Sequence, residues 1–201
     1  MRWALTLCLG LLVVGPGARP LSRFAIESTS STELRIFMPF APDGLARGYR
    51  VTEQKRADCW IGSIASPNRP DAWRCITPEG LILDPCLENP FQPGTRELAC
   101  AWSPWDRRLV VIMARQLPEK YRNHGTPLEK AWPWALELAN GAKCLRITGT
   151  ALIWAGVRWG YGCGNGYASD EIDRSGRLWK VFFWSTGRVS AERATVVVAW
   201  Y

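Results

Sequence analysis

Six cysteines constrain the fold of this chain more than any other feature of its sequence. The chain has 201 residues and seven cysteines, an odd number, but Cys8 lies in an N-terminal segment with the pattern of a cleavable export signal. The six that remain are Cys59, Cys75, Cys86, Cys100, Cys144 and Cys163. They can pair completely, and disulfides persist in oxidising compartments. The count therefore predicts an exported protein held together by three disulfides.

Spacing alone leaves the pairing open, because six cysteines allow 15 connectivities. We predict that sequence neighbours pair, as Cys59–Cys75, Cys86–Cys100 and Cys144–Cys163. Each bridge would close a loop of about 15 to 20 residues and stabilise the fold by roughly 3 kcal/mol in the chain-entropy description. Three such bridges would rival the whole net stability of a domain.

The cysteine and histidine pattern gives no support for metal, redox or cofactor chemistry. No Cys-x-x-Cys pair occurs, and the one histidine, His124, is distant in sequence from every cysteine. Zinc ribbons and thioredoxin-type motifs both require close pairs. Residues 170–176 (DEIDRSG) gather oxygen ligands before a glycine but lack the alternating aspartates and distal glutamate of a calcium loop. We therefore expect no metal and no cofactor.

The first 18 residues have the organisation of a signal peptide. Arg2 supplies the positive charge, residues 3–14 are apolar, and small residues with a proline precede a predicted cleavage near Ala18. An apolar run of this length is too short to span a bilayer, which requires about 20 residues. A buried helix is the alternative, but such a helix would normally carry a polar face. We expect a secreted or extracytoplasmic protein without a membrane span.

We divide the chain into a signal peptide (1–18), a lead-in segment (19–48) and a single disulfide-bonded domain (49–201). The formal net charge is +7, but the basic residues are scattered and form no dense block of the kind that follows a nucleic-acid backbone. We therefore expect no nucleic-acid partner. Anionic envelope polymers, a cell-wall glycan or an envelope protein suit a basic exported protein better. The oligomeric state is left open.

Tryptophan is the outlier of the composition, with 12 residues, 11 of them after the predicted cleavage site. Indole rings can build the core of a small domain. They can also act as flat platforms for sugars, because the apolar face of a sugar ring stacks on an aromatic face. Core packing is the commoner role, since large aromatics are usually buried. The candidate binding residues are Trp60, Arg69, Asp71, Trp73, Trp102, Trp105 and Trp132.

The secondary-structure pattern is mainly β. Short strands are predicted at residues 34–37, 49–52, 73–76, 81–83, 98–102, 108–114 and 151–159. Residues 134–147 predict a hairpin around Asn140-Gly141, the preferred dipeptide of a type I′ turn. Residues 178–184 and 194–201 predict a second hairpin, and apolar side chains on both faces of its first strand indicate a central strand covered on both sides.

No apolar pattern of helical period extends over 12 or more residues, although residues 66–74 could hold one helical turn. The predicted fold is therefore a disulfide-stapled, mainly β domain. We expect an antiparallel sheet, sandwich-like or barrel-like, with one or two short helices.

Three segments carry a resemblance: residues 59–75 (CWIGSIASPNRPDAWRC), 81–86 (LILDPC) and 133–144 (PWALELANGAKC). They resemble an uncharacterised family of secreted, disulfide-bonded bacterial proteins, in which a similar Ser-Ile-Ala…Asp-Ala-Trp-Arg-Cys stretch precedes Asp-Pro-Cys. The likeness covers about residues 58–201 and implies a bacterial, extracytoplasmic module. It implies no activity and no catalytic residues.

Two functional hypotheses follow. The first is a non-catalytic module that binds envelope glycan or a protein partner through exposed tryptophans and basic residues. The second is an envelope hydrolase with a carboxylate pair, because glycoside hydrolysis needs only two acids about 5 to 10 Å apart. The acids considered are Asp71, Asp84, Asp170, Glu171 and Asp173. A structural alternative is that Arg69 or Arg74 pairs with Asp71 or Asp84 and braces the cysteine-rich half.

Overall fold

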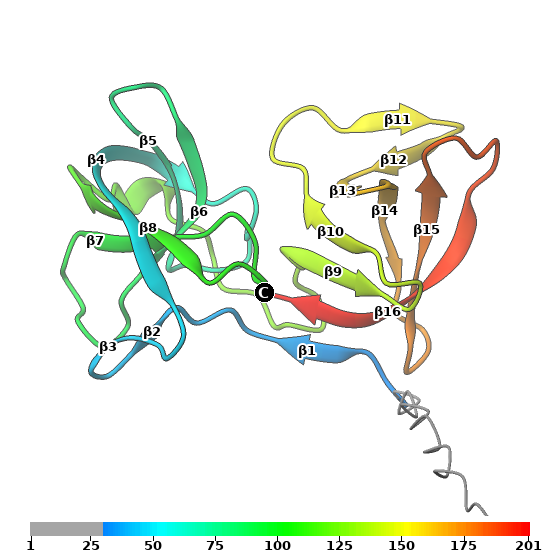
Figure 1. Cartoon of the computed structure of the whole chain (residues 1–201), viewed down its shortest axis with the longest axis horizontal. Coiled ribbons are helices and arrows are strands. Elements are labelled where there is room, and N and C mark those ends of the chain that lie inside the picture. The colour runs from blue at the N-terminus through cyan, green and yellow to red at the C-terminus, as the bar shows by residue number, and fades with distance from the viewer. Residues whose placement is uncertain (1–29) are drawn as a thin grey trace, which may run out of the picture.

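The computed structural model describes residues 30–201, so the predicted signal peptide, Cys8 and residues 19–29 lie outside the described part. It shows two β-barrels packed side by side (Figure 1). The prediction of a mainly β, barrel-like fold is therefore confirmed. The one helical element is the 3₁₀ turn η1 (Glu119–Tyr121) within residues 30–201.

The first barrel consists of five strands in chain order: β4 (Arg50–Gly62), β5 (Ala72–Ile76), β6 (Ile82–Glu88), β7 (Glu97–Cys100) and β8 (Arg108–Ala114). Neighbours in this order pair antiparallel, and a parallel pairing of β4 with β8 closes the ring. Strand β4 reaches both β8 and β5 because it has 13 residues and curves around the barrel (Figure 1).

The second barrel has six strands: β9 (Ala135–Leu138), β10 (Lys143–Arg146), β13 (Tyr161–Cys163), β14 (Gly166–Asp173), β15 (Trp179–Ser185) and β16 (Glu192–Trp200). The pairing of β16 with β9 closes the ring. Strand β1 (Glu33–Arg35) lies parallel to the end of β16, and hairpin β11 (Leu152–Trp154)–β12 (Val157–Trp159) forms a separate two-stranded sheet.

All three predicted disulfides are confirmed, and each joins residues that face each other on neighbouring strands. Cys59 is paired with Cys75 across β4 and β5, Cys86 with Cys100 across β6 and β7, and Cys144 with Cys163 across β10 and β13. Their Cα atoms are 3.9, 4.0 and 4.1 Å apart. The bridges therefore hold adjacent strands in register within each barrel.

Both predicted hairpins are confirmed as well. Strands β9 and β10 pair across the Asn140-Gly141 turn, where Gly141 has a φ of 85°. Strands β15 and β16 pair antiparallel. The inner face of β15 is buried, but Phe182 and Trp184 on its outer face are only half-buried. The expectation of a strand covered on both sides is therefore confirmed only in part, since the outer face is partly covered where Trp184 packs against Trp154 and Tyr167.

Two local predictions are wrong. Residues 151–159 are not one strand but the hairpin β11–β12, which turns at Ala155 and Gly156 with φ angles of 52° and 76°. Positive φ at both central residues is the type I′ geometry, and alanine gives no sign of it. Residues 66–74 contain no helical turn but a reverse turn, in which the Arg69 N–H donates to the Ser66 carbonyl (3.1 Å), before β5 begins.

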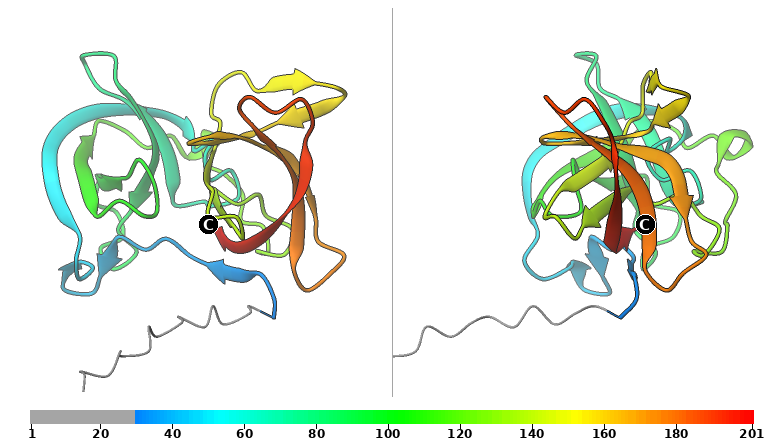
Figure 2. Two further views of the ribbon diagram at one scale, coloured as in Figure 1. Left: turned by 45° about the vertical axis from the view of Figure 1, so that its right-hand side comes forward. Right: turned by 90° about the vertical axis from the view of Figure 1, so that its right-hand side faces the viewer.

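The chain passes from the second barrel to the first and back. Strand β1 belongs to the second barrel, and residues 36–49, with the small hairpin β2 (Phe40–Ala41)–β3 (Gly44–Leu45), lead to β4 in the first. Figure 2 shows this connection along one side of both barrels. Phe37 lies in the junction, with its ring edge-on to Trp134 at 5.1 Å between centroids. Both rings are buried in one cluster with Leu87 and Leu109 of the first barrel, so the connecting segment and the residue before β9 pack together against that barrel.

Candidate functional site

A groove on the second barrel collects polar groups that the fold itself does not use. Its volume is about 540 Å³, which is within the range of small-ligand sites. The lining residues come from the loop before β9, the end of β10, the β11–β12 hairpin and β14: Trp132, Arg146, Gly156, Val157, Arg158, Asp170 and Glu171. We call it the Trp132 groove.

A bulge in β14 places two acidic residues on this groove. The pairing of β14 with β15 shifts register between Ala168 and Ile172. Ser169 holds the bulge: its hydroxyl donates to the Glu171 carbonyl (2.9 Å) and accepts the backbone N–H of Phe182 (3.1 Å). Successive residues of a regular strand point to opposite faces, but bulges re-aim side chains. Asp170 and Glu171 consequently both line the groove.

Asp170 fits tightly against a glycine. A Cβ atom at Gly160 would lie 1.4 Å from Asp170 Oδ1, so only glycine leaves room for this carboxylate. Asp170 Oδ2 is 2.9 Å from Arg158 Nε, in an ion pair whose arginine is largely exposed. Oδ1 is buried and accepts no hydrogen bond within the described structure. One oxygen of Asp170 is thus held and the other is left unsatisfied.

Trp132 and Arg146 form the opposite wall. The Arg146 guanidinium lies 4.9 Å from the centroid of the Trp132 ring, yet 40% of the Trp132 surface is still exposed. Nε and Nη1 of Arg146 are buried and donate to no partner within residues 30–201. A buried polar group without a partner is unfavourable by about 1–3 kcal/mol. Such groups therefore mark places where a water molecule or a ligand completes the hydrogen bonding.

A neutral phenol lies behind Arg146 and does not line the groove. Tyr161 is fully buried, 5.9 Å from the Arg146 guanidinium, and its hydroxyl donates to the Pro133 carbonyl (2.9 Å). Burial raises the pKa of Tyr161 well above that of a free tyrosine. The groove is therefore lined by one partly exposed indole, two guanidiniums and two carboxylates, and the neutral phenol of Tyr161 lies behind Arg146.

The structure brings few of the predicted binding residues together. Only Trp132 lines the groove, and it also lines, with Arg69, a separate cavity of about 20 Å³. Trp60 and Trp102 are exposed on the first barrel and the loop that follows β7, outside the groove. Trp73 is fully buried, and its indole N–H donates to Glu88 (2.6 Å), so it has no surface for a ligand. Trp105 donates its indole N–H to Glu137 of the second barrel (2.8 Å).

Arg69 and Asp71 form an ion pair with each other, at 2.5 Å between Nη2 and Oδ2. Arg69 Nη1 also donates to the Phe37 carbonyl (2.6 Å), at the junction of the barrels. Arg74 pairs with Asp84 at 2.8 Å. The predicted bracing by arginine–aspartate pairs is confirmed, and it accounts for the chemistry of these residues without a ligand.

Asp84 is the most enclosed acid of the predicted set, with a side chain only 3% exposed. Ser63 Oγ donates to it at 2.5 Å, and the backbone N–H groups of Ile64 and Ala65 donate at 3.2 and 3.4 Å. Burial raises the pKa of Asp84, although these donors and Arg74 act in the opposite direction. A carboxylate enclosed in this way holds its loop in place and has no room for a substrate.

Of the remaining acids, Asp170 and Glu171 share the Trp132 groove, whereas Asp173 lies with Glu171 at a separate small hollow. Asp173 accepts from the Ser175 hydroxyl (2.7 Å) and pairs with Arg193 (3.3 Å), whereas Asp170 pairs with Arg158. Within residues 30–201, no three His, Cys, Asp or Glu side chains are placed to hold a metal ion.

Sequence reasoning missed the groove residues Arg146 and Arg158, and Gly160, which packs against Asp170. Arg146 ends a strand that the Asn-Gly hairpin signal had located, but nothing in its neighbourhood shows that its guanidinium lies against Trp132 rather than in solvent. The role of Gly160 depends on the bulge in β14, a strand that no predicted element covers.

Comparison with protein-family models, curated proteins and solved structures found no match. In the described part of the chain, no helix has the length and apolar character needed to cross a bilayer.

Proposed function

We propose that this chain is an exported, non-catalytic module that binds a carbohydrate of the cell envelope in the Trp132 groove. One observation carries the proposal: Arg146 and Asp170, which both have buried polar atoms without a partner in the described structure, line the same hollow as a partly exposed indole. Sugars present complementary groups, namely hydroxyls that both donate and accept hydrogen bonds and ring faces that are apolar.

Each wall has a distinct task in this proposal. The exposed part of Trp132 stacks on the apolar face of a sugar ring, while Arg146 fixes the other side of the indole. The guanidinium donates to a hydroxyl oxygen, and the Asp170 carboxylate accepts from a neighbouring hydroxyl through Oδ2, which Arg158 holds at the groove.

The three disulfides support an oxidising, extracytoplasmic location for this activity. They also support a preformed site. Cys144 lies two residues before Arg146 on β10, and its bridge to Cys163 of β13 fixes the strand that presents the guanidinium. A rigid site loses less conformational freedom when a ligand binds.

The test is binding of the oxidised mature chain to insoluble peptidoglycan and to a panel of soluble glycans, followed by pull-down and tryptophan fluorescence. We expect saturable binding that Trp132→Ala and Arg146→Gln each weaken by about tenfold or more, the loss typical of a central contact residue. Trp102→Ala is the matched control, because Trp102 is 51% exposed but lies outside the groove. Absence of saturable binding to any glycan, or equal losses in the control, would contradict the proposal.

A hydrolase is the second candidate, favoured by the two acids that the bulge places on the groove. Its test is release of reducing ends from the same glycans, with Asp170→Asn and Glu171→Gln as variants. Turnover that both variants abolish would establish hydrolysis. Binding without turnover, weakened by Asp170→Asn, is the result we expect.

A further inference from the structure

A second hollow, on the first barrel, is lined by arginines and by no acid. Its volume is about 300 Å³, and its lining residues are Arg56, Ala57, Arg96, Met113, Ala114 and Arg115. We call it the arginine trough. It lies on a different barrel from the Trp132 groove and shares no residue with it.

Three neighbouring segments place the three arginines close together on the surface of the barrel. Arg56 of β4 stands beside Met113 of β8, and the next pair in register is Ala57 with Ala114. On the other side of β8, the Ala114 N–H donates to the Arg96 carbonyl (2.8 Å). The cations consequently surround the exposed side chain of Met113, while Ala57 and Ala114 face the barrel core.

The positive charge of the trough is only partly neutralised. Arg115 Nε is 3.3 Å from Asp58 Oδ1, but Arg115 is mostly exposed, so this ion pair is weak. Arg56 and Arg96 take part in no ion pair within residues 30–201. Arg96 Nη1 donates to the Arg115 carbonyl (2.6 Å), which holds its guanidinium in place over the trough.

The trough continues into a neighbouring hollow of about 230 Å³ that shares Arg56 and Met113. This second part adds Lys55, which pairs with Glu53 at 2.8 Å, and one acid, Glu97. The excess positive charge is therefore concentrated at the arginine end, while the surface available to a ligand extends beyond it. A chain-like ligand fits this arrangement better than a single ion.

We infer that the arginine trough binds phosphate groups of an anionic polymer. Guanidinium groups are the preferred partners of phosphate because their fixed fork donates two parallel hydrogen bonds to its oxygens. A phosphate seated over Met113 of β8 would lie between Arg56 of β4 and Arg96, the residue before β7. The trough would then anchor the protein to a charged polymer independently of the Trp132 groove.

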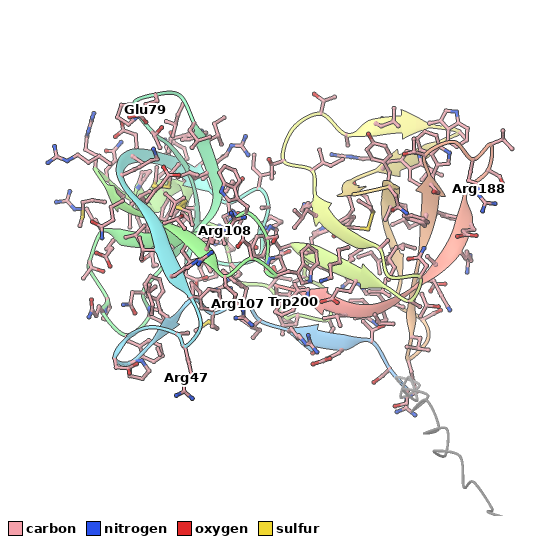
Figure 3. The ribbon with its side chains drawn as sticks, in the orientation of Figure 1. Arg47, Glu79, Arg107, Arg108, Arg188 and Trp200 are labelled. Atoms are coloured by element: carbon pink, nitrogen blue, oxygen red, sulfur yellow. A yellow bond between two sulfur atoms is a disulfide. The ribbon has the colours of Figure 1, made fainter. Side chains whose placement is uncertain are left out.

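The test uses the oxidised mature chain and inorganic polyphosphate of about 15 units, with binding measured by fluorescence anisotropy at low and high salt. The trough variant is Arg56→Gln/Arg96→Gln/Arg115→Gln. The control is Arg47→Gln/Arg107→Gln/Arg188→Gln, which removes the same charge at the separate positions labelled in Figure 3. All six residues are exposed, so both variants are expected to fold, which circular dichroism checks.

We expect the trough variant to bind polyphosphate at least about tenfold more weakly than wild type, and the control by less than about threefold. Equal losses would show that net charge alone attracts the polymer and would overturn the inference. Competition by monomeric phosphate at the same concentration of phosphate groups would overturn the polymer assignment. So would binding to phosphatidylglycerol vesicles in the absence of polyphosphate binding, which would assign the phosphate to a lipid.

Discussion

The two barrels use their charged residues in opposite ways. In the first barrel, enclosed charges are paired: Asp84 accepts from Ser63 and Arg74, and Arg122 lies between Glu88 and Glu119. In the second barrel, Arg146 and Asp170 have buried polar atoms with no partner in the described structure. In the first barrel these enclosed charged groups therefore have partners within the fold, whereas the second barrel leaves polar atoms without one.

Two tryptophans show the same contrast. Arg122 lies 5.0 Å from the ring of Trp73, and Arg146 lies 4.9 Å from the ring of Trp132. The geometry is nearly equal, but Trp73 is fully buried and its arginine is neutralised by two glutamates. Trp132 is partly exposed and its arginine is not neutralised. The environment of the arginine, rather than the presence of an indole, separates a packing contact from a candidate site.

The largest expected difference between the barrels concerns their disulfides. Replacing Cys59, Cys75, Cys86 and Cys100 by alanine should lower the free energy of unfolding by about 6 kcal/mol, at about 3 kcal/mol for each bridge. Replacing Cys144 and Cys163 should lower it by about 3 kcal/mol. Urea denaturation measures both. An equal loss of stability in the two variants would show that disulfides contribute equally to the two barrels.

Removing a buried acid should destabilise the fold more when both carboxylate oxygens have partners, as in Asp84, than when one has none, as in Asp170. Asp84→Ala leaves Arg74 enclosed without its partner and should lower the free energy of unfolding by about 3–5 kcal/mol. Asp170→Ala should lower it by less than about 1 kcal/mol, because Arg158 is 62% exposed and water replaces its partner. Chemical denaturation of both variants provides the comparison, and a larger effect at Asp170 would reverse our assignment of roles.

Gly160→Ala tests whether the groove depends on the close approach of Asp170. The added Cβ must displace the carboxylate, which should lower the free energy of unfolding by about 1–3 kcal/mol through overpacking. Glycan binding should weaken as much as in Asp170→Ala, as measured by tryptophan fluorescence. Gly149→Ala is a suitable control, because a Cβ there meets no atom within 4 Å. Unchanged binding in Gly160→Ala would remove Asp170 from the site.

The smallest expected effect is the pH dependence that Asp84 contributes. Burial raises its pKa, so the folded protein binds this proton more tightly than the unfolded chain does. The contribution to stability is therefore fully present below the unfolded pKa of about 3.9 and is lost as the pH rises through the folded value. Relative to Asp84→Asn, the wild type should gain stability as the pH falls toward about 3. Parallel pH profiles of the two proteins would contradict this sign.

The sequence predicted the parts of the fold that depend on local chemistry. The Asn140-Gly141 turn prefers one geometry, and alternating apolar residues mark the strands beside it. The disulfides followed because cysteines close in sequence lie on strands joined by short connections. By contrast, the Ala155-Gly156 turn and the β14 bulge carry no such signal. Their geometry depends on contacts with residues distant in the chain.

The candidate site was predictable only in part for the same reason. Trp132, Asp170 and Glu171 were each considered, but in different roles and without a reason to join them. Whether a polar side chain is satisfied depends on its neighbours in space, as the paired Asp84 and the unpaired Asp170 Oδ1 show. Residue type and sequence spacing do not contain that information.

The pairing of β1 with β16 has a consequence for the order in which the chain can be built. These strands come from near the two ends of the described chain, and every strand of the first barrel lies between them in sequence. During synthesis from the N-terminus, the first barrel can close as soon as β8 has emerged. The second barrel must wait for β16, so a ribosome that stalls before residue 192 would leave a finished first barrel beside an open second one.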